Sequence, residues 1–262
     1  MGTPIKLGIS SCLLGERVRW NGDHKLDRVL TDTLGKFVEY VPVCPEVECG
    51  FNIPREPFRL VGDPSSPRLI TSHTKHDYTD RMIHWARKRV AELEKEGLFG
   101  FIFKSNSPSS GMGRVKVYNE AGIPAKKGVS IFARVFMEHF PLVPVEEEGR
   151  LHDPKLRENF IERIFTLKRW REALGGKENR GNLVKFHTKH KMLILSHSPW
   201  HHRMMGKLVA QVKGIPLKGL YKEYQKLLME ALRLKSTAKK NTNVLAHISG
   251  YFKKQLSWDE KQ

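Results

Sequence analysis

The stretch VPVCPEVECG, Val41–Gly50, decides how the rest of this sequence is interpreted. It ends an apolar, β-branched run and then places two cysteines and two glutamates within six residues: Cys44, Glu46, Glu48 and Cys49. A thiolate is a soft metal ligand and a good nucleophile, so cysteines at the end of a strand favour a metal, a cluster or covalent chemistry. The alternative is that these cysteines only pack as small hydrophobic side chains. The third cysteine, Cys12, also follows an apolar run.

Strands alternate with helices over the first part of the chain. Short apolar runs predict strands at 5–9, 38–43, 98–103, 115–118 and near 142–145, and helical spacing predicts helices at 24–37, 78–96 and 129–140. The proline-containing region 50–75 predicts a long irregular excursion, and 122–127 predicts a turn. The alternation predicts an α/β domain with a mostly parallel, Rossmann-like sheet.

The ligand crevice of such a sheet lies outside the carboxyl ends of its strands. Loops that begin at Ser10, Cys44 and Lys104 each follow a predicted strand. We therefore expect one crevice to gather side chains that are distant in sequence: Cys12, Cys44, Glu46, Ser107, Ser109 and Ser110. Glu48 stays an alternative to Glu46, because a spacing of two in an extended chain puts both carboxylates on one side.

The pattern changes after a charged break at 147–150. Helical spacing then predicts helices at 153–174, 182–196, 199–212, 217–234 and 241–255, with no alternation typical of strands. We expect two domains, an α/β domain at 1–149 and an all-α domain at 150–262. Most aromatic side chains of the second domain are expected in its core, and one or two could stack on unpaired bases.

Positive charge is concentrated in this second part. Residues 1–150 hold 22 Lys and Arg against 19 Asp and Glu, whereas residues 151–262 hold 24 against 9. This asymmetry favours a polyanion such as a nucleic acid over a merely solvated basic surface. The candidate phosphate contacts are Lys185, Lys189, Lys191 and Arg203. The pairs His187/His190 and His197/His201 have spacings of zinc ligands, but without a cysteine or carboxylate to complete a site they are expected to pack, cap or touch phosphate.

The composition excludes some classes of protein. No apolar run approaches the length that crosses a bilayer, so we expect no membrane partner. An odd number of cysteines, three, does not form a disulfide scaffold, and a cytoplasmic protein is expected.

Four ordered stretches resemble a known family: 10–25 (SSCLLGERVRWNGDHK), 41–50, 54–62 (PREPFRLVG) and 103–118 (FKSNSPSSGMGRVKVY). They look like the thiouracil desulfidase-like (TudS-type) domain. Residues 151–258 are similar to the YbgA-type helical domain that is often fused to it. The resemblance implies a tRNA 4-thiouridine desulfidase that restores uridine, with the helical domain holding the RNA and no DNA partner.

The resemblance also implies a cofactor and site residues. The family uses a [4Fe-4S] cluster held by three cysteines, which leaves one iron free to take the sulfur of the substrate. By motif, Cys12 and Cys44 are cluster ligands, Glu46 is the acid–base residue, and Ser107 is the hydroxyl that assists. Lys104, Arg17, Arg19 and Arg55 either neutralise phosphate or cluster charge, or are ordinary surface residues.

This chain departs from the family at Ser110, which stands where the third cysteine is expected. Three interpretations stay open. Ser110 replaces a ligand in a functional member, Cys49 supplies the missing thiolate, or the cluster site is lost and a tRNA-binding protein remains. Serine is a poor ligand for iron–sulfur clusters, which thiolates normally hold. A desulfidase of free thiouracil is a further alternative, in which the basic domain serves another anion.

Overall fold

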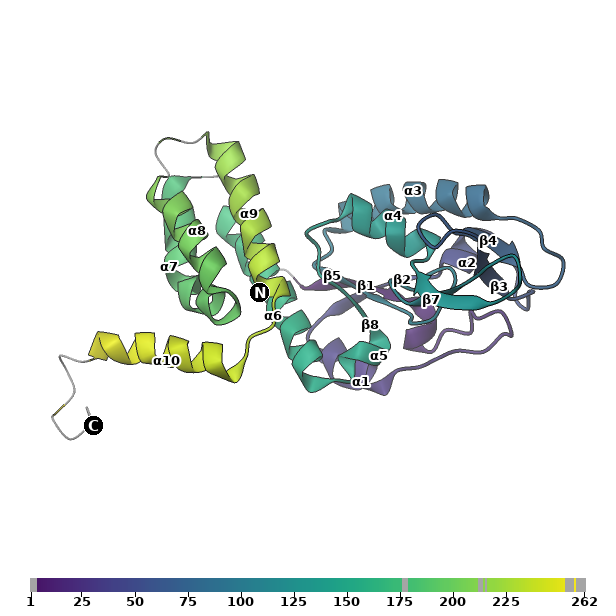
Figure 1. The fold of residues 1–262 in the computed structure, drawn as a ribbon, viewed down its shortest axis with the longest axis horizontal. Coiled ribbons are helices and arrows are strands. Elements are labelled where there is room, and N and C mark those ends of the chain that lie inside the picture. The colour runs from purple at the N-terminus through teal and green to yellow at the C-terminus, as the bar shows by residue number, and fades with distance from the viewer. Residues whose placement is uncertain (1–3, 176–178, 212–213, 215, 253–256, 258–262) are drawn as a thin grey trace. The chain divides into compact units, whose positions relative to one another are not determined.

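The computed structural model describes the chain except residues 1–3, 176–178, 212–213, 215, 253–256 and 258–262 (Figure 1). The chain divides into two compact units, Met1–Phe160 and Ile161–Gln262. The division falls within helix α6, Pro154–Leu174, somewhat beyond the charged break at 147–150. Within the described ranges, no helix combines the length and the hydrophobicity needed to cross a bilayer.

A four-stranded parallel sheet forms the centre of the first unit. Its strands are β1 Lys6–Ser10, β2 Glu39–Val43, β5 Gly100–Phe103 and β8 Val145–Glu147, in the order β2-β1-β5-β8. Every neighbouring pair is parallel. The predicted parallel α/β architecture is therefore confirmed. Because β1 lies between β2 and β5, the loops that follow these three strands emerge side by side at one edge.

A second, mixed sheet was not predicted. It consists of β3 Phe58–Val61, β4 Arg68–Thr71, β6 Val115–Tyr118 and β7 Pro124–Gly128, in the order β4-β3-β6-β7. The predictions of irregular structure at 50–75 and of a turn at 122–127 were wrong. The prolines 54, 57, 64 and 67 lie outside the paired segments, and Pro124 is the first residue of an edge strand, where a missing N–H costs little.

The helices of the first unit connect and cover these sheets. They are η1 Ser11–Leu14, α1 Arg28–Asp32, η2 Leu34–Lys36, α2 Pro45–Glu48, α3 Thr79–Glu96, α4 Ile131–His139 and α5 Glu148–Leu151. The helix predicted at 24–37 is shorter than expected. Its N-cap is Asp27, whose carboxylate accepts the N–H groups of Val29 and Leu30 at 3.1 and 3.2 Å and so fixes where the helix begins.

Aromatic side chains fill the space between the parallel sheet and the helices α3 and α4, which Figure 1 shows on the same side of the sheet. Phe101 stacks on Phe103 with ring centroids 4.3 Å apart, and both pack against Phe132 and Phe136. Strand β5 is buried along its whole length, as its continuous apolar sequence predicts. The central strands are thereby held at fixed positions.

The second unit is helical, as predicted. After α6 come α7 Arg180–His197, α8 Pro199–Ala210, α9 Leu217–Arg233 and α10 Ala238–Phe252. Its core contains Trp170, stacked on Tyr224 with centroids 5.0 Å apart. Trp200, Tyr251 and Phe252 are exposed, contrary to the expectation that most aromatic residues pack inside. The end predicted for the last helix, residues 253–255, lies outside the described residues.

One glycine makes the central pairing of β1 with β5 possible. A Cβ atom on Gly8 would lie 2.2 Å from Cδ2 of Phe101, a ring that is fully buried. Gly8→Ala is therefore expected to destabilise the first unit by about 1–3 kcal/mol, the usual cost of overpacking a core. The urea midpoint measured by far-UV circular dichroism reports this loss.

Gly113→Ala serves as the control, because a Cβ atom there meets nothing within 4 Å. Equal midpoints for the two variants would contradict the assigned contact between β1 and Phe101.

Candidate active site

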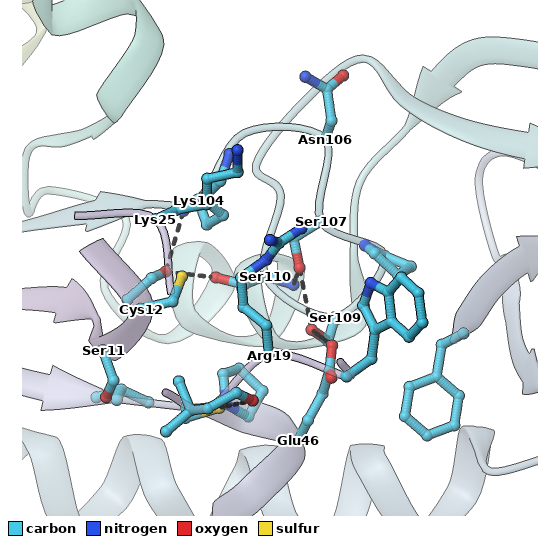
Figure 2. Close-up of a pocket in the computed structure, with 18 of the residues that line it drawn as sticks. Ser11, Cys12, Arg19, Lys25, Glu46, Lys104, Asn106, Ser107, Ser109 and Ser110 are labelled. Atoms are coloured by element: carbon cyan, nitrogen blue, oxygen red, sulfur yellow. Dashed lines mark hydrogen bonds between the residues drawn. The ribbon is translucent and has the colours of Figure 1, made fainter. Parts of the chain in front are cut away.

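Loops from the carboxyl ends of β1, β2 and β5 surround a cavity of about 320 Å³ (Figure 2). Cys12 comes from the loop after β1, Cys44 and Glu46 follow β2, and the serine-rich segment 104–110 follows β5. The lining includes Cys12, Cys44, Glu46, Ser107, Ser109 and Ser110. The structure thus brings together six side chains that span 99 positions of the sequence.

The two thiols of the cavity are close enough to influence each other. Burial raises the pKa of the Cys12 thiol to about 11, and the neighbouring Cys44 raises it further while Lys104 lowers it. Burial also raises the pKa of the Cys44 thiol. Both thiols are consequently protonated at neutral pH, and a metal centre that binds them must displace two protons.

Ser110 lies on the same wall as Cys12 (Figure 2). Its hydroxyl and that of Ser10 form a hydrogen bond of 2.8 Å, and the Ser10 hydroxyl accepts the backbone N–H of Lys104 at 3.0 Å. Ser110 is 3% exposed. The position where the resemblance expects a third thiolate therefore holds a buried hydroxyl that is hydrogen-bonded to Ser10.

The remaining cysteine faces elsewhere. The Cys49 thiol lies 3.8 Å from the carbonyl oxygen of Arg81 in α3, and it packs among Leu60, Leu69 and other apolar side chains. Cys49 is not among the residues that line the cavity. Because α2 carries this residue around to the helix α3, the structure does not bring Cys49 together with Cys12 and Cys44.

The structure separates the two candidate carboxylates. Glu46 lines the cavity, and its Oε2 accepts the Nε–H of Arg55 at 2.7 Å as well as an Nη2–H of the same guanidinium. Glu48 instead accepts the N–H of Cys44 at 2.8 Å and pairs with Arg89. The segment is the short helix α2 rather than a strand, so residues two apart point in different directions.

The side chains of Ser107, Ser109 and Glu46 form a chain of hydrogen bonds along the cavity. Ser109 donates to Oε1 of Glu46 at 2.7 Å, and the hydroxyls of Ser107 and Ser109 are 3.1 Å apart. The Ser107 hydroxyl also accepts the N–H of Ser110 at 3.1 Å. A proton can pass along these oxygens between Ser107 and Glu46, although 61 residues separate them in sequence.

Two glutamates that the sequence analysis did not single out hold the serine-rich loop. Glu148 accepts the N–H of Ser105 at 2.6 Å and pairs with the Lys104 ammonium. The pKa of Glu147 is raised by burial, while backbone N–H groups of Gly113 and Met112 act to lower it. The only available sequence signal is the run Glu146–Glu148 after a predicted strand. By itself this run indicates only a charged break between two domains.

The four basic residues named in the sequence analysis of the first unit differ in what they contact. Arg55 and Lys104 are committed to Glu46 and Glu148. Arg19 lines the cavity and forms only a long contact of 3.8 Å with exposed Asp23. Arg17 is exposed and is absent from the cavity lining. Arg55 therefore fixes a carboxylate, whereas Arg19 can meet a ligand.

The donor set can be compared with the needs of an iron–sulfur cluster. In the part of the chain that the structure describes, no three side chains of His, Cys, Asp or Glu converge on one point. Two thiols and the Ser110 hydroxyl do line one cavity, with Lys104 nearby to offset negative charge. These residues fit a cluster held by two thiolates and one oxygen, which is a weaker ligand for iron than a thiolate.

The predicted RNA contacts lie on two helices of the second unit. Lys185, Lys189 and Lys191 are on α7 and Arg203 is on α8. Lys191 reaches Tyr251 at 3.2 Å, and Lys185, Lys189 and Arg203 are exposed. The histidines nearby have structural partners: His187 bonds the Tyr224 hydroxyl at 3.1 Å, His190 the carbonyl of Phe186, His197 that of Leu234, and His201 the Ser198 hydroxyl.

Comparison with known proteins gives two family matches and three relatives. The 2-thiouracil desulfurase family matches residues 7–148, and a family described as a protein of unknown function (DUF1722) matches residues 191–262. Uncharacterized protein YbbK of Bacillus subtilis (strain 168) is 33% identical over 113 residues, which are 40% of this chain and 72% of that protein. Uncharacterized protein YbgA of Escherichia coli (strain K12) is 30% identical over 101 residues, 38% of this chain and 60% of that protein.

The solved structure of the [4Fe-4S]-dependent thiouracil desulfidase TudS is 27% identical, with a TM-score of 0.47, and covers 57% of this chain and 94% of that chain. The match to the 2-thiouracil desulfurase family spans more than half of the chain and contains every loop that lines the cavity. On this evidence the chain belongs to the 2-thiouracil desulfurase family.

Proposed function

We propose that this protein removes sulfur from 4-thiouridine in tRNA and leaves uridine. The observation that carries the proposal is the cavity itself, where two thiols, a carboxylate paired with Arg55 and a line of serine hydroxyls face one space. The overall reaction is a hydrolysis, in which the C=S group and water give a C=O group and hydrogen sulfide. It therefore requires a site for sulfur and a site that moves protons.

The proton-moving site is Glu46. Arg55 holds its carboxylate in place at a largely buried position. An ionised Glu46 can take a proton from the water that attacks the ring carbon, and Ser107 can exchange protons with it through Ser109. Breaking such a buried pair leaves an uncompensated charge, so Arg55 supports both the geometry and the charge of Glu46.

The sulfur site is formed by Cys12, Cys44 and Ser110, which would hold the iron–sulfur cluster. When bound, a cluster with an iron that the protein does not ligate supplies a soft Lewis acid for the departing sulfur. The chain's own contribution is to orient the two thiols toward the cavity and to place Lys104 beside them.

The basic second unit supports RNA as the carrier of the thiolated base. Its charged residues are far more often positive than negative, and Lys185, Lys189 and Arg203 are exposed on neighbouring helices α7 and α8. Desulfuration of free thiouracil, the compound in the name of the family, is the second candidate and needs only the first unit.

Glu46→Gln should lower kcat by about 10²–10⁴-fold, because the amide cannot accept the proton. Desulfuration is followed by the loss of the near-UV absorbance of the thiolated base. Glu48→Gln is the matched control, since Glu48 lies two residues away, is excluded from the cavity lining and faces Arg89. An equal loss of kcat in both variants would show that Glu46 is not the residue that accepts the proton.

Ser110→Cys should increase the iron and acid-labile sulfide bound after anaerobic reconstitution, toward about four of each per chain, because a thiolate replaces an oxygen ligand. Cys12→Ser should lower both. Cys49→Ser is expected to leave both unchanged, because this thiol faces α3. Loss of the cluster in Cys49→Ser would show that Cys49 is a ligand and that the assignment of Ser110 is wrong.

Replacing Lys185, Lys189, Lys191 and Arg203 together by Gln should raise KM for thiolated tRNA and flatten its salt dependence, by about one unit of slope for each lost phosphate contact. Turnover of free 4-thiouracil should not change. The control removes the same charge from exposed Lys36, Lys88, Lys95 and Lys127 of the first unit. If both sets of variants process tRNA equally, the second unit does not hold the RNA.

A further inference from the structure

Trp20 is a tryptophan of the cavity lining. Even there, 44% of its surface is exposed. Among the described residues, no other ring packs against it, whereas Trp85 packs against Phe132 and Trp170 against Tyr224. Leaving a large apolar ring in water forgoes the free energy of burial, so such a ring at the mouth of a cavity indicates a ligand that covers it.

The backbone around Trp20 is held firmly although the side chain is free. The Trp20 carbonyl accepts the N–H of Arg55 at 2.8 Å, and Arg55 is itself fixed by Glu46. Gly22 closes the turn, since its N–H bonds the carbonyl of Arg19 at 2.9 Å and its φ of 75° is one that glycine adopts readily. The backbone that carries the indole is thus held in place, so only the side-chain torsions of Trp20 have to be ordered when a flat ligand binds.

The lining provides two kinds of surface. Trp20, Pro57 and Phe58 provide flat or apolar surface, while Cys12, Cys44 and Ser110 are the residues proposed to form the sulfur site. Glu46 and Ser107 also line the cavity. A pyrimidine ring has a flat face for the first surface and a thiocarbonyl group for the second.

Two cations share the cavity lining with Trp20. Arg19 precedes it in the sequence, and Lys25 is an exposed residue that lies beside Lys104 (Figure 2). An aromatic ring and cations in one binding site are the combination by which proteins hold an unpaired nucleotide, with the base stacked and the adjacent phosphates neutralised.

We propose that Trp20 is the stacking platform for the thiolated base, and that the protein therefore acts on a nucleotide turned out of its base stack, with Arg19 and Lys25 facing the flanking phosphates. This inference rests on the proposed function and names the residue that selects for an extruded pyrimidine. A base still stacked between its neighbours has no free face for the indole.

The test measures two quantities in full-length protein. The first is kcat/KM with thiolated tRNA and with 4-thiouridine, and the second is quenching of intrinsic tryptophan fluorescence by 4-thiouridine 5′-phosphate. Trp20→Ala should lower kcat/KM by about 5-fold to 100-fold with both substrates, the usual cost of losing one stacked base. Trp20→Phe keeps an aromatic face and should retain most of the activity while it loses the ligand-dependent quenching.

Phe37→Ala is the matched control, because Phe37 is 70% exposed in the same unit and does not line the cavity. It should retain both activity and quenching. Active wild-type protein with unchanged kcat/KM and unchanged quenching in Trp20→Ala would overturn the stacking assignment and leave the proposed function standing. A different result is that the wild-type protein releases no sulfide, yet shows quenching that Trp20→Phe loses. This result would support the base platform and refute the desulfuration.

Discussion

The parallel pairing of β1 with β2 on one side and with β5 on the other is the constraint on which the rest of the first unit depends. Parallel neighbours end at the same edge of a sheet, so this order alone brings the segments after Ser10, Val43 and Phe103 to one place. The pairing is tight because Gly8 leaves room for the Phe101 ring, and Phe132 and Phe136 of α4 pack against that ring. A site assembled from three distant segments is therefore as rigid as the core beneath it.

Buried charge in this site is consistently paired. Glu46 is held by Arg55 and Ser109, and Glu148 is held by Lys104 and Ser105. An unpaired carboxylate at such depth would destabilise the fold, and these partners hold the two carboxylates in one direction. The two thiols are different, because burial raises the pKa of each and leaves them protonated at neutral pH. The cavity thus holds a paired carboxylate beside two neutral thiols.

Sequence reasoning succeeded where the signal was local. The apolar run at 98–103 and the stripe of Met82, Ala86, Val90 and Leu93 predicted β5 and α3, and both elements bury those residues. It failed at 50–75, where prolines masked two short strands that depend on distant pairing, since β4 pairs with β3 and β3 pairs with β6. It also left Glu46 and Glu48 unresolved, since the direction of each carboxylate depends on whether the segment is a strand or a helix. The contacts of Glu147 and Glu148 had no local signature.

The sequence by itself determined the class of the fold, the positive second half, the family and the residue types available for chemistry, because these depend on periodicity, composition and ordered motifs. Only the tertiary structure decided which of those residues meet. It placed Cys49 against α3 and away from Cys12 and Cys44, linked Ser107 through Ser109 to Glu46, and left the Trp20 ring uncovered at the cavity. The reason is physical: contacts between distant segments follow from strand order, helix direction and the packing of the core, and none of these can be read from the spacing of residues along the chain.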